Sequence, residues 1–471
     1  MYRNCKKGNN LIKDLNTQKE FKMASEIHDI DLNEKFHFSD KAKKTLFIIL
    51  GLGVVSLVIG ILIEIFGGGS HGEHASLMLE NDALASTNAI SASEEHPYHW
   101  WNKLFVDMWI NNVYFTGLAL IGIFWVAIQY VASAGWSAGF KRVPEAFGYF
   151  LPITGVLTIL VFVIAGHDMF HWTHTDLYDE TSASFDKIIN GKKGFFFIPS
   201  SESTPSIPYF YYLRMIFFFL GWILFFNLIR KQSILEDLNA GIVHYRKMIT
   251  ISGAFLVFFG LSSSMSAWDW VMSIDTHWFS TMFGWYVFAS WFASGLAAIT
   301  LFLVLLREAG YLKIINENHL HDMGKFVFGF SIFWTYIWFS QFLLIYYANM
   351  PEETIYFYER FASDTYSKYI FFNLIMNFFF PFLALMTRDA KRKMTFLKIV
   401  CTVVLVGHWF DFFLMITPGT LKEHGGFGFM ELGVTMIYLF GFLWVVLSNL
   451  AKEKLIAVNH PMLQESIHHT T

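Results

Sequence analysis

His408 and Asp411 lie three residues apart in VGHWFDFFLMITPG (406–419), a stretch otherwise apolar enough to be buried in lipid. An Asp at the centre of a membrane-spanning helix costs ~2.5–3.5 kcal/mol even on insertion scales, and such residues usually mark a functional site. A His–Asp pair one helical turn apart can pass protons at physiological pH, because an imidazole titrates near neutrality. The pair therefore predicts a proton path or a ligand pocket.

Two further clusters repeat at i, i+4 and i+7 near the ends of apolar runs. They are Ser262, Ser266 and Asp269 in one run, and His167, His171 and His174 in another, where Asp168 follows His167. Each spacing predicts a single helical stripe. A His at the membrane interface costs little free energy, and a Ser/Asp stripe can merely hold helices together. The depth of a residue in the membrane therefore decides between a functional and a structural role. Asp411 is the deepest acid, about seven residues, or ~10 Å at ~1.5 Å per residue, from the end of its apolar run.

Membrane-spanning helices must position these clusters. The chain has 471 residues, of which 54% are hydrophobic and only 15% charged, against about a quarter in soluble domains. A hydrocarbon core ~30 Å thick requires about 20 apolar residues per span. Ten such spans can be read, at 45–66, 107–132, 147–167, 209–229, 249–272, 279–306, 325–349, 369–387, 396–417 and 428–448. The sequence therefore predicts an all-α polytopic membrane protein with ten transmembrane helices.

The basic residues of the connections predict the orientation. The two tails and the loops on their side hold 26 Lys and Arg, whereas the opposite loops hold seven. Both termini are therefore predicted to face the cytoplasm, and all three clusters to lie towards the outer side. The predicted organisation is a tail over 1–44, a membrane domain over 45–448 with outer loops at 67–106 and 168–208, and a tail over 449–471. Residues 1–22 lack the apolar core of a cleavable signal, and Met23 is an alternative start.

A weak internal repeat appears when the spans are offset by four. The fifth span carries Trp268-Asp269-Trp270-Val271-Met272, and the ninth carries Phe410-Asp411-Phe412-Phe413-Leu414 at the matching place. An even offset gives two halves that point the same way, which is a parallel repeat related by an axis along the membrane normal. Chance similarity between aromatic-rich helices is the alternative explanation.

The sequence lacks the usual patterns for a redox centre. It has no C-x-x-C-H motif, and its two cysteines, Cys5 and Cys401, provide neither an iron–sulfur cluster nor a disulfide framework. Only His167 and His408 are plausible haem ligands within spans, which allows at most one site. The net charge of −4 does not suggest nucleic acid as a partner. We therefore expect no metal or redox cofactor in this chain, and proton handling near the outer surface suits quinol oxidation.

Three segments resemble a known family. GHDMFHWTHTD (166–176), SSSMSAWDWVMSID (262–275) and, most specifically, FGFSIFWTYIWFSQFLLIYYANMPEET (328–354) are similar to the NrfD/polysulfide-reductase membrane-anchor family. Within it the match is to the ActF-type subunits of bacterial alternative complex III, over about residues 40–450. The resemblance implies two four-helix bundles, spans two to five and six to nine, flanked by spans one and ten, in agreement with the repeat.

The resemblance also implies a function in a complex of the bacterial inner membrane. Such a complex oxidises menaquinol or ubiquinol and passes electrons to cytochrome c or a terminal oxidase. Its haem c and iron–sulfur clusters belong to partner subunits on the outer face, and a sister NrfD-like membrane subunit is expected beside this one. The sister subunits bind quinol through a His and an Asp near the outer face, and the matching positions here are His167 and Asp269.

These observations lead to one interpretation and two alternatives. We expect a subunit without its own redox centre, in which a proton path or quinol pocket is lined by Asp411, His408, Asp269, Ser266, Ser262, His167, Asp168 and His171. A secondary transporter would usually show broken helices at matching places in both halves, but Pro152 and Pro381 fall in spans that do not correspond. A purely structural membrane anchor would tolerate the loss of every intramembrane acid.

Overall fold

The computed structural model describes residues 31–67, 98–197 and 207–470. Residues 1–30, with the alternative start at Met23, lie outside this part, as do 68–97 and 198–206 of the two predicted outer loops. Ten helices among the described residues are long and apolar enough to cross a membrane. Apart from one isolated bridge, the regular structure described is helical. The predicted class, an all-α multi-pass membrane protein with ten spanning helices, is confirmed.

The spanning helices are generally longer than the apolar runs that predicted them. They are α2 (Asp40–Gly67), α4 (Trp100–Val131), α5 and α6 (Arg142–Phe147 and Leu151–Met169), α9 (Tyr209–Leu238), α10 (Ile242–Trp270), α11 (Phe283–Glu308), α12 (Glu317–Ala348), α14 and α15 (Ser367–Leu374 and Phe380–Ala384), α16 (Met394–Leu421) and α17 (Phe429–Leu450). The short helices are α7 (Lys187–Gly191), α8 (Lys193–Phe196), α13 (Pro351–Phe361) and α18 (Leu463–Ile467). Since α4 begins at Trp100, the predicted loop 67–106 was too long.

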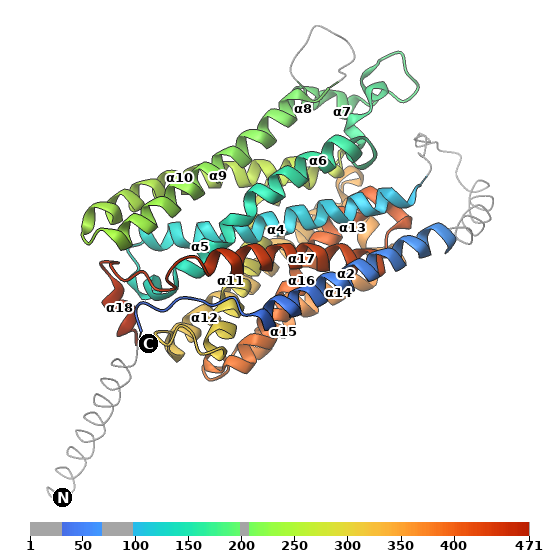
Figure 1. The fold of residues 1–471 in the computed structure, drawn as a ribbon. Helices are drawn as coiled ribbons and strands as arrows, with labels where there is room; N and C mark the ends of the chain where they lie inside the picture. Colours follow the sequence, from blue (N-terminus) through green and yellow to red (C-terminus); the bar gives the residue numbers. More distant parts are fainter. Residues whose placement is uncertain (1–30, 68–97, 198–206, 471) are drawn as a thin grey trace, which may run out of the picture.

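The helices form two bundles with a flanking pair (Figure 1). In the first bundle α4 packs on α6 and α10, and α9 packs on the same two helices. In the second, α11 packs on α12 and α16, and α14 and α15 pack on α16. Helices α4 and α11 join the two bundles, while α2 packs on α17, which packs on α4. The predicted two bundles plus two flanking helices are confirmed.

The two bundles meet where α4 and α11 come into close contact. A side chain at Gly117 would collide with the indole of Trp291, and one at Gly295 would collide with Ile121. The Trp291 indole N–H donates to the backbone oxygen of Val113 at 3.1 Å, so the contact is also hydrogen-bonded. Glycine at both places lets the helix backbones approach, as is usual between membrane helices.

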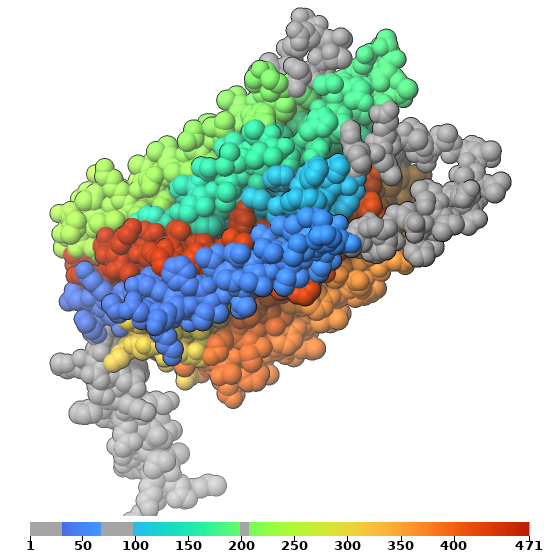
Figure 2. All heavy atoms as spheres, turned by 45° about the vertical axis from the view of Figure 1, so that its right-hand side comes forward, coloured from blue at the N-terminus to red at the C-terminus, as the bar shows by residue number. Residues whose placement is uncertain are grey.

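Helix α2 lies on the outside of the molecule, as Figure 2 shows. One of its faces contacts α17, where the Ser56 hydroxyl donates to the backbone oxygen of Phe429 at 2.7 Å. Its other side chains, including Ile48, Leu52 and Val55, are exposed. A helix that exposes large apolar side chains along its length fits contact with lipid tails.

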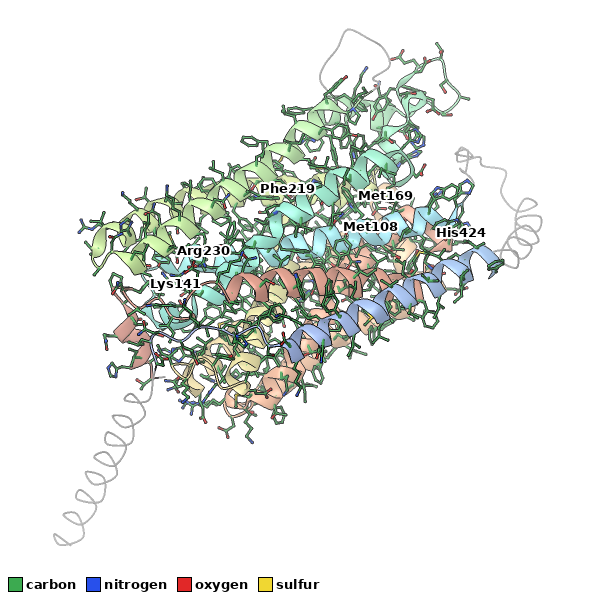
Figure 3. All side chains as sticks on the ribbon, in the orientation of Figure 1. Met108, Lys141, Met169, Phe219, Arg230 and His424 are labelled. Atoms are coloured by element: carbon green, nitrogen blue, oxygen red, sulfur yellow. The ribbon has the colours of Figure 1, made fainter. Side chains whose placement is uncertain are left out.

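The two ends of the molecule differ in what they carry. We call them the α13 end and the α18 end; in Figure 3, His424 lies towards the first, and Lys141 and Arg230 towards the second. The described parts of both tails meet at the α18 end, because the Leu455 backbone N–H donates to the backbone oxygen of Glu34. Both tails therefore lie at the same end, and its cytoplasmic location stays a prediction from the basic residues.

Candidate functional site

Asp411 lies in the second bundle, fully buried and surrounded by hydrogen-bond donors from three other helices. The Trp334 indole of α12 donates to its Oδ2 at 2.8 Å, and the Asn373 amide of α14 donates to its Oδ1 at 3.0 Å. The Tyr286 hydroxyl of α11 also donates to Oδ1. Three donors satisfy much of the acceptor capacity of a carboxylate, and none of them brings a positive charge.

His408 precedes Asp411 by one turn, and the two side chains are neighbours as their spacing predicts. The His408 Nδ1 atom lies 4.0 Å from Asp411 Oδ2 and 3.0 Å from the Ser290 hydroxyl of α11. Its other ring nitrogen, Nε2, is buried without a hydrogen-bond partner among the described residues. A buried ring nitrogen without a partner is uncommon in native proteins and is typical of functional sites.

An irregular stretch of the eighth span positions the Asn373 amide, which donates to Asp411. A π-helical turn over Ile375–Phe379 joins α14 to α15, and Asn377 in this turn donates to the Asn373 side-chain oxygen at 2.5 Å. A side chain at Gly407 would collide with the Asn377 amide, so glycine is needed there for this approach. The π-turn is of the kind often found at functional sites.

A cavity of about 30 Å³ adjoins Asp411 towards the α13 end. Tyr286 and Asn373, which both donate to Asp411, line it together with Gln341, Arg360 and mostly aromatic side chains. Since one water needs roughly 10–15 Å³, the cavity holds about two waters. Pockets for drug-sized ligands occupy about 300–1,000 Å³, so the cavity suits water rather than a quinol ring.

Arg360 of α13 lines the cavity and donates hydrogen bonds to the backbone of α16. Its guanidinium donates to the backbone oxygens of Leu414 at 2.9 Å and Met415 at 3.0 Å, and it is 4% exposed. Residue 418 of α16 is a proline, which has no N–H for the carbonyl four residues earlier. Arg360 therefore supplies the donor that Pro418 withholds from Leu414.

The charge of Arg360 is balanced across the two bundles. Asp275, which follows α10 of the first bundle, accepts from its guanidinium at 3.0 Å. Glu359 lies beside this ion pair, and burial together with the charge of Asp275 raises the pKa of Glu359 to about 7. A carboxyl with that pKa exchanges protons near neutral pH, and Glu359 lies outside the spanning helices, next in sequence to the arginine that lines the cavity.

Asp269 is held differently from Asp411. Two nitrogens of Arg214 in α9 donate to its two carboxylate oxygens, at 2.8 and 2.7 Å. A third nitrogen of Arg214 donates to the backbone oxygen of Phe195 at 2.6 Å. This bidentate pair neutralises the acid within the first bundle, which is a structural arrangement. Ser262 accepts from the Trp222 indole, and Ser266 donates to backbone oxygens of its own helix.

The histidine cluster differs from the prediction. Helix α6 ends at Met169, so His171 and His174 lie in the turns that follow, and the expected single helical stripe is wrong. The His174 ring nevertheless lies near both others, with centroids 4.1 Å from His167 and 5.6 Å from His171. His167, Asp168 and His171 are exposed, whereas Asp269 is buried against α9. The structure therefore does not bring His167 to the carboxylate of Asp269.

Sequence reasoning missed most partners of the two acids. They are Arg214 for Asp269, and Tyr286, Trp334 and Asn373 for Asp411. One signal was available, since Arg214 is the only Lys or Arg more than three residues inside a predicted span. An intramembrane arginine requires a nearby acid, and Asp269 is the partner it has. The predicted end of the ninth span was also too early, because α16 continues to Leu421, about ten residues beyond Asp411.

Comparison with known proteins does not assign the chain to a family, because no protein-family model matches it and no similar curated protein was found. Among the described residues, no group of three or more His, Cys, Asp or Glu side chains is arranged to hold a metal ion. In the part of the chain that the structure describes, fold and site together define a multi-pass membrane protein in which an arginine compensates Asp269 and neutral donors hold Asp411.

Proposed function

We propose that this chain is a membrane subunit of a quinol-oxidising respiratory complex of the bacterial inner membrane, in which Asp411 carries protons towards the α13 end. The resemblance of residues 166–176, 262–275 and 328–354 to NrfD-like subunits supports the complex. The surroundings of Asp411 support the proton role. The α13 end is the outer side by the distribution of basic residues.

One observation carries the proposal: Asp411 is a fully buried carboxyl that has donors but no Lys or Arg partner among the described residues. In the described structure, the one basic side chain within ion-pair distance of it is His408, whose charge itself depends on a proton. Asp269, by contrast, is paired with an arginine that keeps its charge at any physiological pH. Of these two acids, Asp411 is therefore the one without an arginine partner among the described residues.

The contacts around Asp411 outline a route to the α13 end. Tyr286 donates to the carboxylate and also lines the cavity, so its hydroxyl can pass a proton from Asp411 to water in the cavity. Beyond the cavity lies the Arg360–Asp275 pair, with Glu359 beside it as an exchangeable carboxyl. His408 extends the route on the opposite side of Asp411 through Ser290.

The size of the cavity favours protons over quinol as the occupant of this site. At about 30 Å³ it is roughly a tenth of the smallest usual ligand pocket. We therefore propose that menaquinol or ubiquinol is oxidised in the sister NrfD-like subunit. Electrons would then pass to haem c and iron–sulfur subunits at the α13 end, and onward to a terminal oxidase.

A secondary transporter is not favoured. Transporters commonly bind substrate between helices that are broken at matching places in the two halves. Under the offset of four, the eighth span, which contains the π-turn, corresponds to the fourth span. The fourth span is α9, which is a continuous helix over Tyr209–Leu238. The break in one half alone fits a specialised site in the second bundle.

The test uses the complex purified from its native membrane through a tag on this chain. Co-purifying haem and iron–sulfur subunits would support the assembly, and their absence would refute it. In that complex, Asp411→Asn should lower quinol-oxidase turnover or its proton release by about tenfold or more, while haem content is kept.

The substitution should not prevent folding. The new amide nitrogen must face one of the three donors, which costs about 1–3 kcal/mol. Glu64→Gln, in an acid at the end of α2, is the matched control and should leave turnover unchanged. Normal turnover and proton release in assembled Asp411→Asn would refute the proton role, and loss of assembly would favour a structural anchor.

A further inference from the structure

A second cluster of ionisable residues lies at the α13 end, where α2, α4 and α17 meet. The Lys103 ammonium of α4 lies 2.7 Å from Glu64 Oε1 of α2 and 3.1 Å from Glu431 Oε1 of α17. Each acid has a further donor, because Tyr98 donates to Glu64 at 3.1 Å and the backbone of Gly428 donates to Glu431 at 2.7 Å. One lysine is thus shared by two carboxylates, each of which has a further donor.

Asp107 brings a third carboxyl to the same place, one helical turn along α4 from Lys103. It is 1% exposed, and its Oδ2 atom is enclosed without any hydrogen-bond donor among the described residues. The charged groups that act on it are Glu431 from α17, Glu64 from α2 and Lys103 from its own helix. Two of these three are negative, and the one cation is already bound to both.

An ionised carboxylate in this position would be strongly unfavourable. Burial without a donor removes the hydration of the charge, and two neighbouring carboxylates repel it. A proton removes both penalties at once. A metal ion is a poorer fit, because no group of acids or histidines among the described residues is arranged to coordinate one.

Polar residues continue from Asp107 along α4 into the membrane domain. Asn111 donates to the backbone oxygen of Asp107 at 2.8 Å and accepts from the Trp409 indole of α16 at 3.1 Å. One residue on, Asn112 accepts from the Tyr438 hydroxyl of α17 at 2.8 Å. The Asn112 amide nitrogen and the Thr116 hydroxyl are buried without partners in the described structure.

We propose that Asp107 is a proton-binding carboxyl that is protonated at rest. It is the first residue, towards the α13 end, of a polar row formed by Asp107, Asn111, Asn112 and Thr116. The row lies between α4, α16 and α17, and is distinct from the route through Asp411 and the cavity. The proton on Asp107 does not depend on quinol oxidation. The two proposals can therefore fail separately.

Infrared spectroscopy of the full purified chain tests this inference. A protonated carboxylic acid has a C=O stretching band that carboxylates and amides lack, and the band shifts in heavy water if the proton exchanges. Asp107→Asn should lose intensity equal to one carboxyl in this band. Glu145→Gln is the matched control, from an acid held by Arg230 away from this cluster, and should lose none. Unchanged band intensity in folded Asp107→Asn would overturn the proposal.

A second measurement keeps the test valid if that variant does not fold. Asp carrying heavy carbon in its side-chain carboxyl is incorporated into the Asp411→Asn chain, where Asp107 remains. The acid band should move to lower frequency. A band that stays in place would assign the proton to a glutamate and refute the proposal. If the band appears only after Na⁺ is removed, a cation rather than a proton is bound to the carboxyl at rest, and this result also refutes the proposal.

Discussion

The pairing of Arg360 with Pro418 leads to a prediction about stability. Arg360→Met removes the donors to Leu414, Met415 and Tyr356, and leaves Asp275 without its partner. Breaking a buried ion pair by removing one member costs about 3–5 kcal/mol. The free energy of unfolding should fall by that amount.

Pro418→Ala should partly restore the Arg360→Met variant. Alanine supplies the backbone N–H that Leu414 lacks, so the carbonyl left by Arg360 regains a donor within α16. The gain in helix propensity, up to about 3 kcal/mol, is the same with or without Arg360 and cancels in a double-mutant cycle. What remains is one hydrogen bond to a buried carbonyl, so the coupling energy should be about 0.5–1.5 kcal/mol in favour of the double variant.

The assay is unfolding of the four purified chains in mixed detergent, with the free energy measured by the same probe. Pro152→Ala is the control, because Pro152 lies in the first turn of α6, where no intrahelical donor is missing. Its combination with Arg360→Met should be additive. If Pro418→Ala is additive as well, within about 0.3–0.5 kcal/mol, the idea that Arg360 replaces the missing donor is wrong.

Three other measurements follow from the sequence and the site. The purified chain alone should show no haem Soret band, because it lacks a haem-attachment motif; a stoichiometric haem in it would refute this. Reporter fusions after Arg142 and after Lys193 should report cytoplasm and outer side respectively, and the reverse would overturn the orientation and the proposed direction of the proton route. Burial and Asp275 raise the pKa of Glu359 from 4.5 to about 7, so its protonated form stabilises the fold below about pH 4.5 and that contribution is lost as the pH rises through about 7. Melting temperatures below and above that pH should therefore differ less in Glu359→Gln than in the natural chain, and equal differences would contradict the role of Glu359.

Helix number and bundle order could be predicted from the sequence because they depend on signals that are local or repeated. A run of about 20 apolar residues is forced to span, and the match between residues 268–272 and 410–414 set the offset of four. The ends of the spans were less predictable. Helix α4 starts at Trp100, before the apolar run, because Lys103 is held by ion pairs with Glu64 of α2 and Glu431 of α17.

The candidate site was predictable only in its deepest members. His408 and Asp411 stand out because lipid makes ionisable residues costly wherever they occur in a span. Tyr286, Trp334 and Asn373 carry no such signal, since aromatic and amide residues are common in helix contacts. Their role depends on how α11, α12 and α14 are rotated about their axes, and this is decided by packing between helices far apart in the sequence.

The two acids that the predicted repeat aligns differ in their partners. Both lie among aromatic residues, yet a neighbouring helix provides Arg214 to Asp269, whereas only neutral donors reach Asp411. The bidentate pair of Asp269 with Arg214 holds two helices together, which suits the first bundle as a scaffold. An acid with neutral donors can hold its proton or release it, and the adjoining cavity has room for the water that would take the proton up. The same position in the repeat thus favours a structural role in one bundle and a proton-carrying role in the other, and the difference lies in the partner residue rather than in the acid.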